Sequence, residues 1–166
     1  MRRHPPTDRF ESLTGEILGA IEQAIASHPE IAECCVVGIP DALKGHLPFA
    51  FVTLSTHEHP RGAVPLDSLF KEVQRNVREQ IGAIASLGGM IQGTRMIPRT
   101  RSGKTLRRVL RELVENAVHG EFEKEVQVPT TIEDADAVNV ARSKIREYFE
   151  IKGKDLHRAT EARVRL

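Results

Sequence analysis

The feature that most constrains the fold is a nearly continuous apolar run from Ile31 to Ile39. It is rich in β-branched residues, which is typical of a buried strand. A second apolar run, Phe49 to Leu54, follows after a short connection that contains Pro40-Asp41. Because a short connection returns the chain beside itself, we expect the two runs to pair as antiparallel strands.

Apolar residues with helical spacing flank these runs. The stretches 13–27, 65–81 and 106–117 each place Ile, Leu, Val or Ala on one helical face. A third apolar stretch, Met90 to Ile97, favours a strand that Pro98 ends, because proline has no N–H for a strand ladder. The order helix, strand, strand, helix, strand, helix predicts an α+β fold with a small, largely antiparallel three-stranded sheet flanked by helices.

The 166 residues suit one domain followed by a tail. We expect residues 1–12 to be a lead-in, residues 13–120 to form the domain, and residues 121–166 to be a helical extension. Within the extension we predict a helix over 132–149, followed by a polar tail. The apolar face of that helix consists of Val138, Ala141, Ile145 and Phe149.

Several classes of protein are not expected from the composition. The sequence has no run of about 18 apolar residues, so we expect no membrane partner. The first residues lack the apolar segment of a secretory signal. The adjacent Cys34 and Cys35 point to opposite faces of the predicted strand, so we expect reduced thiols. A cytoplasmic or mitochondrial protein, and not a secreted one, is therefore expected.

A basic stretch carries the main candidate site, Lys104, which follows the permissive turn Ser102-Gly103. We predict that Lys104 lies at the tip of a hairpin-like excursion, at the start of a helix. A phosphate-binding Walker loop needs glycine where Pro98 stands, so that interpretation is disfavoured. The basic residues crowded here are Arg95, Arg99, Arg101, Lys104, Arg107, Arg108 and Arg111.

A nucleic-acid interface is the second interpretation of this basic cluster. It is not expected, because the net charge is only +1 and no aromatic side chains for base stacking are interleaved. A solvated helix face is the simpler interpretation of the arginines. No metal site is expected either, because His57-Glu58-His59 lacks a third ligand at credible spacing.

The stretch from Pro98 to Arg108 resembles the last signature of the adenylate-forming acyl-CoA synthetases, P-K-T-R-S-G-K-[IL]-x-R-R. It departs from that signature at Arg99 and Thr105. Three further stretches resemble E-x-A-V-V-G-x-P-D, K-G-x-x-x-x-A-F-V and V-R-x-x-I-G-x-x-A of the family, the last from its acetyl- and propionyl-CoA synthetase branch. They are residues 32–41, 44–52 and 77–85. The resemblance covers roughly residues 18–115 and concerns the small C-terminal domain of that family.

The resemblance implies roles for individual residues. Enzymes of this family join a carboxylate to ATP, giving acyl-AMP and pyrophosphate; their C-terminal domain then swings, and CoA attacks to form the thioester. Lys104 matches the lysine that enters the active site for adenylation. Arg78 matches an arginine that contacts CoA phosphates, with an ordinary surface arginine as the alternative. Lys44-Gly45 lies in the turn that faces CoA, although simple turn chemistry also accounts for Lys44.

ATP and CoA are therefore the expected substrates of the full enzyme, and Mg²⁺ is expected with ATP in a large N-terminal adenylation domain. No stretch of the chain resembles that domain, so the chain is expected to be inactive as an acid–thiol ligase without such a partner. The hinge and Gly-x-Arg elements of the family are absent or scrambled, with Asp8-Arg9 as a hinge remnant. The alternative is a stand-alone, non-catalytic remnant that acts as a binding or interaction module.

Overall fold

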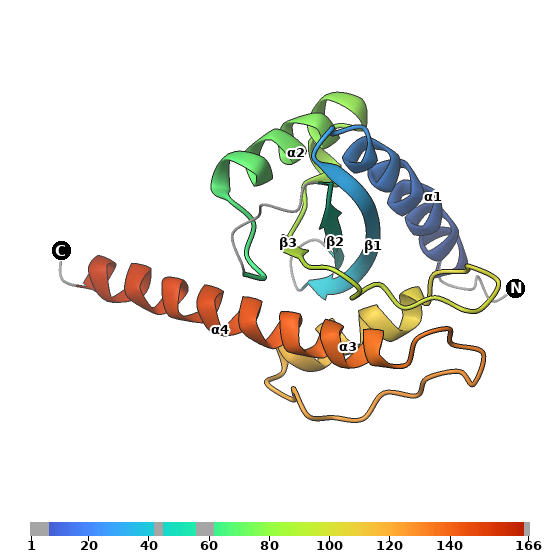
Figure 1. Cartoon of the computed structure of the whole chain (residues 1–166). Coiled ribbons are helices and arrows are strands. Elements are labelled where there is room, and N and C mark those ends of the chain that lie inside the picture. Colours follow the sequence, from blue (N-terminus) through green and yellow to red (C-terminus); the bar gives the residue numbers. More distant parts are fainter. Residues whose placement is uncertain (1–6, 42–44, 56–61, 165–166) are drawn as a thin grey trace, which may run out of the picture.

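A computed structural model describes residues 7–41, 45–55 and 62–164 of the chain (Figure 1). The elements follow one another as helix, two strands, helix, a short 3₁₀ turn, a third strand and two helices. They are α1 (Thr7–Ala26), β1 (Ile31–Asp41), β2 (Gly45–Leu54), α2 (Asp67–Gln80), η1 (Ala83–Ala85), β3 (Gly89–Gln92), α3 (Arg107–Val118) and α4 (Asp136–Val164).

The three strands form one sheet in the order β1-β2-β3. Strands β1 and β2 are antiparallel, with Val36 opposite Ala50, as the short connection between them predicts. Strands β2 and β3 are parallel, with Ala50 opposite Met90. Because α2 lies between β2 and β3 in the chain, β3 returns in the same direction as β2. The predicted largely antiparallel α+β sheet is therefore confirmed, and the parallel pair makes it mixed.

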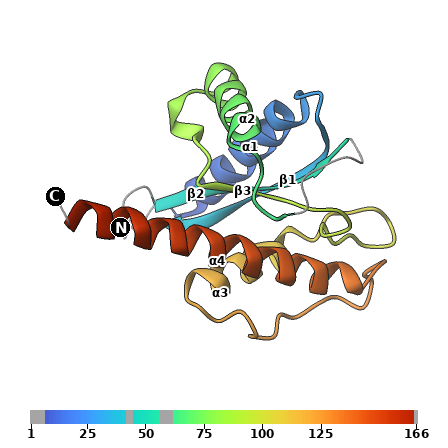
Figure 2. The same cartoon turned by 60° about the vertical axis from the view of Figure 1, so that its left-hand side comes forward.

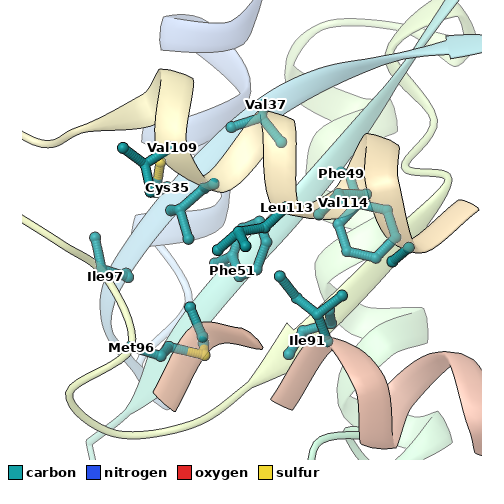
Figure 3. Close-up of a cluster of buried hydrophobic side chains, with 14 of the residues drawn as sticks. Cys35, Val37, Phe49, Phe51, Ile91, Met96, Ile97, Val109, Leu113 and Val114 are labelled. Carbon is teal, nitrogen blue, oxygen red and sulfur yellow. The ribbon is translucent and has the colours of Figure 1, made fainter. Parts of the chain in front are cut away.

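The sheet separates two apolar layers. Helices α1 and α2 cover one face, and α3 and α4 cover the other (Figure 2). Successive strand residues point to opposite faces, so Phe51 joins the α3/α4 layer while Ala50 joins the α1/α2 layer. In Figure 3, Phe51 lies among Ile91 and Leu113, and all three are buried. Both faces of β1 and β2 are covered, which is why these strands are nearly continuous apolar runs.

Helix α4 is part of the domain core, because four of its buried residues belong to the same apolar cluster as β2 and α3. Tyr148 packs edge-on against Phe49, with ring centroids 5.5 Å apart. Gly89 allows this approach, since a Cβ atom there would lie 2.5 Å from the Phe49 ring and 2.6 Å from the Tyr148 hydroxyl. The buried α4 residues are Ala137, Val138, Ala141, Ile145 and Tyr148.

Both terminal helices are longer than predicted. Helix α1 begins at Thr7, inside the predicted lead-in, and α4 continues to Val164, through the predicted polar tail. The apolar face that located the last helix ends at Phe149, but no proline follows it, so nothing in the backbone ends the helix there. Helix α4 also starts at Asp136 and not at residue 132.

The third strand is shorter than predicted, because β3 ends at Gln92 and not at Ile97. Beyond Gly93 the chain turns through Arg95, whose φ of 57° is in the left-handed region. Met96 and Ile97 are buried by packing in the α3/α4 layer, without a strand ladder. Met96 and Ile97 are therefore apolar because they are buried, and not because they belong to a strand. No helix in the described part of the chain is long and apolar enough to cross a membrane.

Candidate functional site

Lys104 lies on the loop that joins Ile97 to α3, at the end of a small hairpin closed by a bridge between Arg99 and Thr105. The hairpin-like excursion is therefore confirmed. Helix α3 begins only at Arg107, so Lys104 lies on the loop before the helix and not at its first residue, as we had predicted. Its side chain is exposed, and no carboxylate among the described residues is within ion-pair distance of its ammonium group.

The backbone of the loop is held by several hydrogen bonds around Thr100. The Thr100 amide donates to the Lys104 carbonyl at 2.9 Å, and the Lys104 amide donates to the Thr100 hydroxyl at 3.1 Å. The Gly103 amide donates to the Thr100 carbonyl at 2.8 Å, with φ of 88° at Gly103. At the base of the loop, the Leu106 amide donates to the Pro98 carbonyl at 2.9 Å. The backbone of Lys104 is thus fixed, while its ammonium group is exposed and has no partner among the described residues.

Two ion pairs fasten the ends of the loop to the first helix and strand. Arg99 pairs with Glu33 of β1. Arg107 pairs with Glu22 of α1, with Nη2 2.6 Å and Nε 3.1 Å from the Oε1 atom of Glu22. The same oxygen accepts a hydrogen bond from the Val36 amide at 2.9 Å. The bond to Glu22 raises the pKa of Arg107. The loop is therefore tied to both α1 and β1.

These pairs bear on the basic cluster as a whole. Most of its arginines that have a partner among the described residues reach carboxylates on other elements, so their charge is partly neutralised locally. The exposed pair within α3 is long, at 3.9 Å. The absence of a nucleic-acid interface stays a prediction. The ion pairs are Arg95–Asp134, Arg99–Glu33, Arg107–Glu22 and Arg111–Glu115.

Arg78 lies near the end of α2, on the exposed face opposite the buried Val73 and Val77. Its Nε atom donates to the Ser86 hydroxyl at 3.4 Å. Beside it is a shallow hollow of about 390 Å³, to which three cationic side chains of α2 contribute. Lining residues are Phe70, Lys71, Gln74, Arg75, Arg78 and Glu79. The spacing of the three cations, four and three residues apart, places them on one side of the helix.

The predicted site residues do not converge on one site. Arg78 is on α2, whereas the Lys104 loop leads into α3, on the opposite face of the sheet (Figure 2). Gly45 begins β2 with φ of 79°, a conformation that suits glycine. Lys44 lies outside the described residues, as does the His57-Glu58-His59 stretch. Among the residues that the structure does describe, no cluster with the composition of a metal site occurs.

Residues 20–104 match the AMP-binding enzyme C-terminal domain. The chain belongs to this family. The matched stretch ends at Lys104 itself, so it contains the lysine but neither α3 nor α4.

The relatives of this AMP-binding enzyme C-terminal domain include curated acetyl-coenzyme A synthetases. That of Pyrobaculum aerophilum is 40% identical over 149 residues, covering 89% of this chain and 20% of the relative. That of Bartonella quintana is 42% identical over 111 residues, covering 66% of this chain and 16% of the relative. The chain thus spans about a fifth or less of the length of these relatives. Likeness to the first of them continues past the matched residues 20–104 into the extension over 121–166.

Solved structures share the fold. An acyl-CoA synthetase from Brucella canis is 28% identical with a TM-score of 0.53, over 61% of this chain and 18% of that one. An acetoacetyl-CoA synthetase from Streptomyces lividans has the same TM-score of 0.53 over 81% of this chain and 18% of that one. At 23% identity, the second likeness speaks to the fold alone.

The anchors of the lysine loop were not found from the sequence of this AMP-binding enzyme C-terminal domain. Glu22 is 85 residues from its partner Arg107, and no local pattern links the two. Glu33 belongs to a stretch that we compared with the family, but its pairing with the loop depends on how β1 and the loop are placed in space. The one feature of the sequence that could have indicated this pairing is that Glu22 lies beside the apolar face of its predicted helix.

The two cysteines are free thiols, as predicted, and point to different layers. Cys35 is buried in the α3/α4 layer, and Cys34 packs against the α1/α2 layer and donates from Sγ to the Glu22 carbonyl at 3.3 Å. Burial, followed by the charge of Glu22, raises the pKa of Cys34 to about 11 and that of Cys35 to about 12. Neither thiol has the lowered pKa of a nucleophile.

Proposed function

We propose that this domain is the C-terminal part of a short-chain acyl-CoA synthetase and that Lys104 supplies the cation for its adenylation step. The observation that carries the proposal is the Lys104 loop itself, whose backbone is held by hydrogen bonds while the ammonium group is exposed. An exposed cation on an ordered loop is suited to act in the active site of another domain, because its position is set before the two domains meet.

The chemistry proposed for Lys104 is electrostatic. In adenylation, a carboxylate oxygen attacks the α-phosphorus of ATP and pyrophosphate leaves, so two anions must approach each other. An ammonium group between them offsets that repulsion and the charge that develops during transfer. Lysine suits this role, because its charge is compact and its stem is long. Mg²⁺ would accompany ATP in the N-terminal adenylation domain, which also selects the acyl group.

The second half-reaction is thioester formation, in which the CoA thiol displaces AMP. We assign CoA phosphates to the hollow beside Arg78, because Lys71, Arg75 and Arg78 bring three positive charges to one side of α2. Gly45 would lie near the CoA path through the turn before β2, together with Lys44. The Lys104 loop is tied to α1 and β1 and leads into α3, whereas the hollow lies on α2, so the two half-reactions would use different parts of the domain in turn.

The partner that the proposal requires is an N-terminal adenylation domain. A cytoplasmic or mitochondrial location, where thiols stay reduced, is the one we propose, on the strength of the free cysteines. The second candidate function is a non-catalytic module that binds CoA or a protein partner. It is favoured by one specific observation, since the cationic hollow is formed entirely by α2 of this chain.

The adenylation role can be tested by ATP–pyrophosphate exchange with acetate or propionate. The chain is mixed with the N-terminal domain of an acetyl-coenzyme A synthetase, and Lys104→Ala is compared with Lys124→Ala, which removes another exposed lysine. We expect exchange that depends on the chain, falls about a hundredfold or more with Lys104→Ala, and is unchanged with Lys124→Ala. No exchange above that of the N-terminal domain alone, or equal loss in both variants, would contradict the proposal.

The second candidate is separated by titration calorimetry of the chain alone with CoA. Binding that weakens on Arg78→Ala and at higher salt, in a chain that gives no exchange in any mixture, favours the binding module. As a control, Arg111→Ala removes an exposed arginine of α3, on the other face of the sheet, and should leave CoA binding unchanged. If the unmodified chain gives no heat of binding with CoA, CoA is not its ligand.

A further inference from the structure

A short segment of the extension runs beside the lysine loop. We call residues Pro129–Asp134 the strap. Ile132 of the strap forms an antiparallel bridge with Thr100. The Arg101 amide donates to the Thr131 carbonyl at 3.0 Å, and the Glu133 amide donates to the Arg99 carbonyl at 2.8 Å. The strap therefore pairs with the loop as an added strand would, on backbone atoms that the loop's own hairpin leaves open.

The strap is anchored at its far end by Asp134. One carboxylate oxygen accepts from the Asp136 amide at 3.0 Å, which caps the start of α4. The other accepts from the Arg95 guanidinium at 2.9 Å, in the turn that precedes the lysine loop. Arg95 is the residue with a left-handed φ of 57°. A single side chain thus joins the strap, the first turn of α4 and the chain entering the loop.

The connection that leads to the strap is also fastened. Arg142 of α4 donates to the carbonyls of Phe122 and Lys124, both at 2.8 Å. Arg146 lies over the Phe122 ring, 5.4 Å from its centroid. Figure 1 shows the connection between α3 and α4 following α4 back to the level of the lysine loop. The segment that contains the strap is therefore held at one end by contacts with α4 and at the other by the hydrogen bonds of Asp134.

We propose that the strap is a positioning element for Lys104, which orders the backbone of the loop before the domain meets its partner. The proposal rests on the proposed function of Lys104, and it adds a role to the extension that the residue 20–104 match leaves out. Thr100 is the link, because it bridges to the strap at Ile132 and bonds to the amide and carbonyl of Lys104. A loop ordered in advance loses less conformational freedom when its lysine engages substrate.

A matched pair of substitutions at Glu133 tests the ordering directly. Glu133→Pro removes the amide that donates to Arg99, while Glu133→Ala keeps it, and the Glu133 side chain is exposed. Proline is acceptable after Ile132, because a bridge residue already has the extended backbone that proline favours before it. Hydrogen exchange of the full chain is the readout, with amides in β1 and β2 as internal reference.

With Glu133→Pro we expect exchange at Arg101 and Lys104 to quicken roughly fivefold or more, the effect of losing about one hydrogen bond. Glu133→Ala and the reference amides should be unchanged. Unchanged exchange in the loop, or a uniform rise over the whole domain, would overturn the proposal. If Glu133→Pro fails to fold, Asp134→Ala replaces it, with Asp134→Asn expected to restore protection because asparagine also caps helices.

A kinetic readout then separates positioning from simple stability. In the mixture with the N-terminal domain, Glu133→Pro should lower adenylate formation from ATP, while thioester formation from supplied acetyl-AMP keeps its rate. Equal loss in both half-reactions would contradict a positioning role. Failure of the unmodified chain to support either half-reaction would count against the proposed function alone, since hydrogen exchange decides the strap without any substrate.

Discussion

Replacing Ile145 by alanine tests whether the extension is built into the domain core. The Ile145 side chain is 2% exposed, within the cluster that includes Phe51 of β2 and Leu113 of α3. Isoleucine-to-alanine changes at such sites cost about 2–5 kcal/mol, from lost transfer free energy and the cavity left behind. Alanine returns roughly 0.4 kcal/mol through its higher helix propensity. We therefore expect a loss of about 3 kcal/mol in the free energy of unfolding.

The matched control is Ile151→Ala, in the same helix, where the isoleucine is 40% exposed. We expect it to cost less than about 1 kcal/mol, because little burial is lost and helix propensity improves. Urea unfolding followed by circular dichroism measures both. With a slope of about 2 kcal/mol per molar urea, Ile145→Ala should lower the midpoint by about 1.5 M with one transition. Equal small effects for both variants, or a separate early transition for α4, would refute a shared core.

Three further predictions use the same unfolding assay. Glu22→Ala should cost about 1–3 kcal/mol, because it leaves the Val36 amide and the Arg107 guanidinium without their acceptor. The control Glu115→Ala breaks only the long ion pair with Arg111, so it should change stability by less than about 0.5 kcal/mol. Gly89→Ala should cost about 1–3 kcal/mol, because the added Cβ would overlap the Phe49 ring and the Tyr148 hydroxyl. Gly19→Ala in α1, where nothing lies within 4 Å, should be neutral or stabilising, and the reverse order would contradict the packing described. The pKa of Cys34 is raised from 9.0 to about 11 in the folded state, so the unfolded thiol ionises first and stability should fall as the pH rises from about 9 to about 11. The fall should be smaller in Cys34→Ala, which keeps the similar contribution of Cys35.

Apolar spacing located the central elements well, because burial determines both the spacing and the packing. The stripes over 65–81 and 106–117 became α2 and α3, and the β-branched run became β1. The same apolar spacing gave a wrong strand boundary where residues are buried without belonging to a strand. Met96 and Ile97 are buried as the pattern implied, but the turn at Arg95 had already ended the ladder.

The candidate site was predictable only in part. The motif around Lys104 gave the exposed lysine and its hairpin, because turn residues act locally. What fixes the loop in place was not predictable, since Glu22, Glu33 and the strap come from remote parts of the chain and meet it through tertiary packing. Charged residues have no spacing rule for partners on other elements, so their pairing emerges only in the folded structure.

The contact of Glu22 with the Val36 amide also has a consequence for self-association. Strand β1 is at the edge of the sheet, where unpaired amides can recruit a strand from another molecule. Glu22 occupies one of these amides, and Pro40, an even number of residues further along, has no amide to offer on the same side. At these two positions the edge therefore has no free backbone amide to pair with a strand of another molecule. Removing the Glu22 carboxylate should make the chain prone to concentration-dependent assembly, because it opens this edge as well as weakening the fold.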